Sequence, residues 1–180
     1  MEYILQRARE AGKEVYEKAK EIIEEGMSRG SRTLRGFEKE VEVDGKTHVV
    51  KVVDGDAEFK RGKGNKTLLK IRITAEVDGV RREYEIAFGR YGRRNATKGY
   101  ATARADAPGG READAERLAV VIKALTGKEP LIRRKSDGTI EIVCGREHLD
   151  GFARYAELAD AIMIMAKGDE PVNAPPAAPH

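Results

Sequence analysis

"LLKIRITAEVDGVRREYEIAF" (Leu68–Phe88) consists of two runs of alternating apolar and polar residues joined by Asp78-Gly79. Because successive side chains of a strand point to opposite faces of a sheet, each run predicts a strand with one buried and one solvated face. Asp-Gly favours the positive φ angles of a type I′ turn, so the stretch predicts an antiparallel hairpin. The expected buried residues are Leu69, Ile71, Ile73, Ala75, Val77, Tyr84, Ile86 and Phe88, with Arg82, Glu83 and Glu85 on or near the polar side.

The same Val-Asp-Gly triplet occurs at residues 43–45 and 53–55, each time between alternating runs, and predicts two further hairpins. After Gly92, another strand is expected from about Thr97 to Ala105. Its small residues alternate with larger ones, and such a face lets a helix, or less readily a ligand, approach closely.

Helical periodicity marks residues 1–26, about 111–126 and about 146–167, and a short hairpin is expected from 131–134 and 139–143. The resulting prediction is an α+β fold. It combines an N-terminal amphipathic helix, an antiparallel sheet built from hairpins, and a β-α-β-β-α C-terminal half. We expect one domain over residues 34–167 and a disordered, proline- and alanine-rich tail over 168–180.

Composition narrows the class of protein further. Of the 180 residues, 36% are charged and only one is cysteine, which excludes a disulfide framework and predicts a reducing, cytoplasmic compartment. No apolar run is long enough to span a bilayer, so no membrane partner is expected. Few amide side chains among many charged ones is typical of thermophilic proteins.

Positive charge is concentrated in "FGRYGRRNATKGYATARADAPGG" (Phe88–Gly110), which has no acidic residue before Asp106. Lys and Arg gain affinity for nucleic acid by releasing counterions, and aromatic faces can stack on bases. The alternative is a thermophilic surface whose arginines pair with glutamates of the sheet. The candidate binding residues are Lys63, Lys66, Arg90, Tyr91, Arg93, Arg94, Lys98, Tyr100 and Arg104.

Three stretches resemble the b-type of the group-two Pyrobaculum aerophilum repeat (PaRep) proteins. They are "LLKIRITAEVDGV" (68–80), "YGRRNATKGYATARADAPGGREADAERL" (91–118) and "LTGKEPLIRRKSDGTIEIVCGREHLDGFARYAELADAI" (125–162). The resemblance covers roughly residues 48–166 and implies a hyperthermophilic archaeal source. It implies no particular activity, and the N-terminal helix and the tail depart from the pattern.

The order of expected elements is also similar to the αββαββα half of LAGLIDADG homing endonucleases, whose sheet lies on DNA. That similarity implies a DNA-binding surface. Those enzymes hold a metal with paired carboxylates, and the nearest match here, "IIEEG" (22–26), lacks the second glycine and the Asp-Gly ending. A degenerate endonuclease using Glu24, Glu25 and Asp106 is therefore an alternative, and we expect no cleavage.

Other candidate chemistry has a simpler structural explanation. Cys144 and His148 are four residues apart, and we expect His148 to cap or pack the last helix instead of activating the thiol. Asp106 is expected to cap a turn, or else to face the basic segment as a possible metal ligand. Three histidines and one cysteine offer no zinc spacing, and no cofactor or metal is predicted.

Two functions follow from these patterns. The first is a non-catalytic nucleic-acid-binding protein, with DNA favoured. The second is a protein-interaction or assembly module in which the helix over residues 1–26 pairs between subunits, as a homodimer or with another protein.

Overall fold

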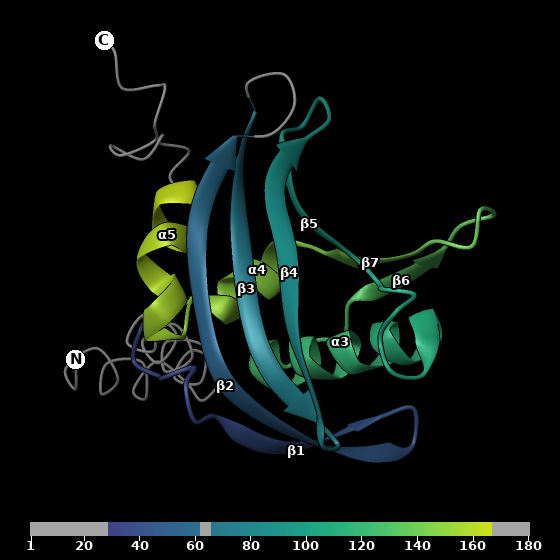
Figure 1. Ribbon diagram of the computed structural model, residues 1–180. Helices are drawn as coiled ribbons and strands as arrows, with labels where there is room; N and C mark the ends of the chain where they lie inside the picture. The colour runs from purple at the N-terminus through teal and green to yellow at the C-terminus, as the bar shows by residue number, and fades with distance from the viewer. Residues whose placement is uncertain (1–28, 62–65, 167–180) are drawn as a thin grey trace, which may run out of the picture.

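The computed structural model describes residues 29–61 and 66–166 and has an α+β fold with a curled, antiparallel seven-stranded sheet (Figure 1). The strand order is β1-β2-β3-β4-β5-β7-β6. The strands are β1 (Glu38–Val43), β2 (Lys46–Arg61), β3 (Thr67–Val77), β4 (Val80–Tyr91), β5 (Ala96–Thr102), β6 (Leu131–Arg134) and β7 (Ile140–Cys144). The helices, labelled as in Figure 1, are α3 (Gly110–Thr126), α4 (Arg146–Phe152) and α5 (Ala156–Ala166). The helix predicted for residues 1–26 and the tail predicted for 168–180 lie outside the described residues.

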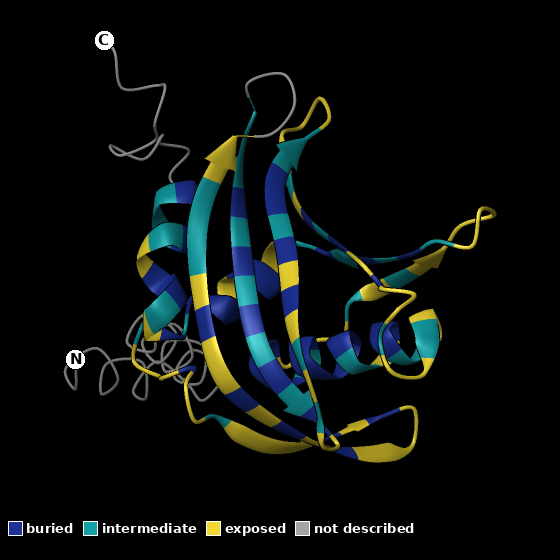
Figure 2. Ribbon diagram, in the orientation of Figure 1, coloured by how far each residue is buried: buried dark blue, intermediate teal, exposed yellow. Residues whose placement is uncertain are grey.

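The hairpin of β3 and β4 is confirmed. Asp78 and Gly79 have φ angles of 51° and 86°, and Val77 pairs directly with Val80. All eight residues expected on the inner face are buried, and in Figure 2 buried residues alternate with more exposed ones along both strands. The Asp-Gly pair therefore predicted the turn of this hairpin, and the alternation predicted its buried face.

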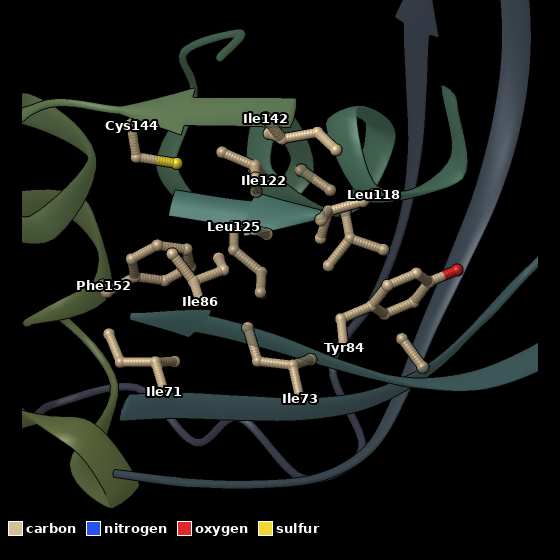
Figure 3. Close-up of a cluster of buried hydrophobic side chains, with 14 of the residues drawn as sticks. Ile71, Ile73, Tyr84, Ile86, Leu118, Ile122, Leu125, Ile142, Cys144 and Phe152 are labelled. Carbon is tan, nitrogen blue, oxygen red and sulfur yellow. The ribbon is translucent and has the colours of Figure 1, made fainter. Parts of the chain in front are cut away.

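The hydrophobic core lies between the inner face of the sheet and the helices. Figure 3 shows Ile71, Ile73 and Ile86 of the sheet facing Leu118, Ile122 and Leu125 of α3, with Phe152 of α4 beside them. Helix α5 packs against β2 and β3. The opposite, outer face of the β2–β5 sheet carries the polar residues of the alternating runs.

The hairpin predicted at residues 53–55 is wrong, because β2 runs through this triplet without turning. The register shifts between Val52 and Asp54, which is a β-bulge. A Cβ atom at Gly55 would lie 2.0 Å from Cδ2 of Leu34, so glycine here makes room for a buried leucine. The Asp54-Gly55 pair therefore lies next to a β-bulge and leaves space for Leu34, and it does not form a turn.

Strand β5 ends at Thr102, three residues earlier than predicted, and its small residues Gly99 and Ala101 are buried. A Cβ atom at Gly99 would lie 2.6 Å from the ring of Phe88, its partner on β4. Phe88 in turn packs edge-to-face on Phe152 with ring centroids 6.3 Å apart. The glycine therefore lets a sheet aromatic lie flat beneath α4.

The last helix was predicted as one element but is two, α4 and α5. Between them, Tyr155 forms a parallel bridge with Arg32, and the Ala156 amide donates to the Arg32 carbonyl (2.7 Å). The Tyr155 hydroxyl donates to the carbonyl of Leu125 (2.7 Å). These long-range contacts stabilise the break between α4 and α5. The apolar periodicity of residues 146–167 does not reveal them, because their partners lie elsewhere in the chain.

Candidate nucleic-acid interface

Six of the predicted binding residues gather at one end of the outer face, around the turn between β4 and β5. We call this surface the basic tip and define it as Lys66, Tyr91, Arg93, Arg94, Lys98 and Tyr100. Gly92 and Asn95 both have positive φ angles, 75° and 55°, and close the turn with an N–H···O=C bond of 3.1 Å. The turn carries Arg93 and Arg94 into solvent at the exposed end of the hairpin (Figure 2).

Strand pairing places Tyr91, Lys98 and Tyr100 on the outer face, and Lys66 lies against the Tyr91 ring. Ala87 pairs with Tyr100 and Gly89 with Lys98, and these positions alternate with the buried Phe88 and Gly99. Tyr91 follows Gly89 on the same face of β4. The two tyrosine rings meet edge-to-face, with centroids 5.4 Å apart, and Nζ of Lys66 lies 3.3 Å from the centroid of Tyr91.

The four cations of the basic tip differ from many other surface cations of the sheet, although Lys39, Lys46 and Lys51 of β1 and β2 are also without an acidic partner among the described residues. Within residues 29–61 and 66–166, Lys66, Arg93, Arg94 and Lys98 have no acidic partner. Elsewhere the pairing expected of a thermophilic surface is present: Lys70 with Glu85 (3.2 Å), Arg72 with Glu58, Arg133 with Glu141 (2.8 Å) and Arg134 with Glu112 (2.7 Å). Local charge at the basic tip is therefore left uncompensated by the described residues.

Three predicted binding residues do not belong to the basic tip. Arg90 lies on the inner side of β4 and donates from Nη2 to the carbonyl of Met165 in α5 (2.5 Å). Arg104 lies beyond the far end of β5 and forms a bidentate pair with Asp106 (3.0 and 2.7 Å). Lys63 is outside the described residues. Because successive side chains of a strand point to opposite faces of the sheet, the neighbours Arg90 and Tyr91 lie on different faces.

The carboxylate of Asp106, predicted to cap a turn or to bind a metal, instead pairs with the guanidinium of Arg104. Its side chain is 70% exposed, and the bidentate Arg104 guanidinium lowers the pKa of the carboxyl group. Helix α3 begins without a side-chain cap. Across the described ranges, no three His, Cys, Asp or Glu side chains converge as metal ligands, and Glu24 and Glu25 fall outside those ranges.

Cys144 and His148 do not form a nucleophile pair. Nδ1 of His148 accepts the Gly145 amide hydrogen (3.0 Å), and Nε2 lies 3.0 Å from the Glu129 carbonyl, so the ring caps α4 as predicted. Burial lowers the pKa of His148, which favours the neutral ring. Burial also raises the pKa of the Cys144 thiol to about 12, the opposite of what a reactive cysteine requires.

This burial predicts an unreactive thiol. At pH 8 the folded protein should react with a thiol reagent such as Ellman's reagent about a thousandfold more slowly than the denatured chain, because the thiolate is the reacting form. The single cysteine makes the signal unambiguous. Equal rates for folded and denatured protein would contradict the buried position of Cys144.

Sequence reasoning missed a buried ionic cluster at the other end of the sheet. Asp114 of α3 is 1% exposed and accepts hydrogen bonds from Nε and Nη2 of Arg82 and from the Arg104 amide. Arg82 was expected on or near the polar side. Asp114 occurs among other acidic residues of the first turns of the helix, and only the position of β4 against α3 shows that its carboxylate is buried.

The described helices do not include one with the length and apolar character needed to cross a membrane. No family model matches the chain, and comparisons with curated proteins and with solved structures found no significant match.

Proposed function

We propose that the basic tip binds nucleic acid and that the protein works by binding, without chemistry of its own. The observation that carries this proposal is the placement of Lys66, Arg93, Arg94 and Lys98 beside two partly exposed tyrosines on one outer surface. Phosphates attract such cations by releasing counterions, and the rings offer faces to bases.

Charge distribution supports nucleic acid over an acidic protein. No acidic residue occurs between Glu85 and Asp106 in the chain, so a backbone following the β4–β5 turn meets only positive and neutral groups. The turn is narrow and exposed, and it presents two adjacent guanidiniums, which bind phosphate in bidentate fashion. Repeated phosphates along a strand match this arrangement.

Charge removal at the turn tests the proposal. The variant Arg93→Gln with Arg94→Gln should bind a fluorescein-labelled oligonucleotide about tenfold or more weakly at low salt, measured by fluorescence anisotropy. Each lost phosphate contact should also reduce the slope of log K against log salt by about 0.7 for a single strand or about 0.9 for a duplex.

The matched control is Arg133→Gln with Arg134→Gln, which removes the same charge from arginines already paired with Glu141 and Glu112. Its affinity and salt slope should stay close to those of the unaltered protein. The proposal fails if the unaltered protein does not bind at low salt, or if both double variants lose affinity equally.

A further inference from the structure

The tyrosines of the basic tip lie on the sheet in a way that requires a glycine. A Cβ atom at Gly89 would lie 2.8 Å from Cδ2 of Leu68 and 3.1 Å from Cε2 of Tyr91. The missing side chain therefore gives the Tyr91 ring room over the β4 backbone, where its edge-to-face contact with Tyr100 fixes both rings. Rings fixed in this way lose little conformational freedom when a ligand stacks on them.

Both rings are accessible to a ligand. Tyr91 and Tyr100 are partly exposed, and desolvation, with a smaller contribution from Tyr100, raises the pKa of Tyr91. Lys66 rests on the Tyr91 ring and has no acidic partner among the described residues. A base that stacks on this ring displaces the ammonium group, which then lies within reach of a neighbouring phosphate.

Carboxylates limit the surface that phosphates can cover. Further along the outer face, β4 carries Glu83 and Glu85 and β2 carries Asp56 and Glu58, all on the side opposite the core. Glu85 and Glu58 are paired with Lys70 and Arg72, so a rigid duplex extending across this face would meet carboxylates and cations that are already paired with one another. A flexible single strand can follow the cationic turn and avoid them.

A groove next to the rings has room for an unpaired base. It has a volume of about 600 Å³ and is lined by Lys70, Arg82, Glu83, Glu85, Tyr100 and Arg104, among others. Its three cations, Lys70, Arg82 and Arg104, are already paired with carboxylates. The carboxylate oxygens of Glu83 and Glu85 can accept hydrogen bonds from a base. The groove therefore suits a base that has left the duplex stack.

We propose that the ligand of the basic tip is single-stranded nucleic acid, with unpaired bases stacked on Tyr91 and Tyr100 and the backbone held by the four cations. This inference rests on the proposed function. A duplex hides its base faces within the stack, whereas single strands present them to aromatic platforms on sheets.

Three fluorescein-labelled probes of equal length test the proposal: oligodeoxythymidylate, its duplex with oligodeoxyadenylate, and an abasic strand that keeps the phosphates but lacks bases. Anisotropy titrations at fixed low salt should give the tightest binding for oligodeoxythymidylate and about tenfold or more weaker binding for the abasic strand. Tyr100→Leu should bring oligodeoxythymidylate down to nearly the abasic level, whereas Tyr100→Phe, which keeps the ring, should not. An unchanged unfolding midpoint for each variant confirms that the fold is intact.

The outcomes separate this inference from the proposed function. Equal affinity for all three probes, or duplex bound most tightly, overturns the single-strand proposal but leaves nucleic-acid binding standing if Arg93→Gln with Arg94→Gln still weakens it. No effect of Tyr100→Leu in a folded variant also overturns it. Absence of binding to every probe overturns both.

Discussion

Asp114→Ala is expected to lower the free energy of unfolding by about 3–5 kcal/mol, because it leaves the guanidinium of Arg82, whose side chain is only 13% exposed, without its counterion. Asp114 is 1% exposed and receives the Arg82 Nη2 hydrogen bond at 2.7 Å and the Arg104 amide at 2.8 Å. These bonds connect α3 to β4 and to the segment that follows β5. Urea unfolding, monitored by circular dichroism, measures this loss of the free energy of unfolding.

The control for this prediction is Asp106→Ala, which removes a carboxylate from an exposed arginine pair eight residues away in the chain. Solvent screens that pair, so the unfolding midpoint should not change measurably. Equal losses for Asp114→Ala and Asp106→Ala would mean that burial does not distinguish the two pairs, contrary to the geometry described above.

Phe152→Ala is expected to cost about 3–5 kcal/mol of the free energy of unfolding, since it opens a cavity where α4 meets the sheet. Phe152 is fully buried and supports the ring of Phe88, which itself covers Gly99. Little can move in to fill the space, because the backbone of β5 lies directly behind Phe88.

Leu131→Ala provides the comparison for Phe152→Ala, because Leu131 is a large apolar residue that is 63% exposed on the edge strand β6. Truncating an exposed side chain outside any special contact usually changes stability by less than about 0.5 kcal/mol. A loss for Leu131→Ala as large as that for Phe152→Ala would show that the edge strand contributes to a hydrophobic contact beyond those described.

Local rules predicted the elements whose stabilising contacts are local. Alternation between Leu69 and Val77 and the Asp78-Gly79 turn specified a hairpin, and Gly127 marked the end of α3 with a φ angle of 82°. The sequence predictions were wrong where residues distant in the chain determine the backbone conformation. The triplet at 53–55 became a bulge beneath Leu34, and the break at residues 153–155 depends on Arg32.

The same limit applies to the candidate site. Enrichment in Arg and Tyr identified the β4–β5 segment, but only strand register shows that Tyr91, Lys98 and Tyr100 share the outer face while Arg90 points inward. Arg104 was another candidate, but it pairs with Asp106 and therefore does not add an uncompensated positive charge to the basic tip. The role of Gly89 beneath Tyr91 depends on the ring's position and could not be read from composition.

Photochemical crosslinking tests the central claim, nucleic-acid binding at the basic tip, most directly. A single-stranded oligonucleotide containing 5-iodouracil is irradiated with the full-length protein, and the crosslinked peptide is mapped by mass spectrometry. We expect crosslinks at Tyr91 or Tyr100, with loss of the Tyr100 crosslink in Tyr100→Leu. Crosslinks confined to other parts of the chain, or no crosslink under conditions where the oligonucleotide binds, would contradict the assignment of this surface.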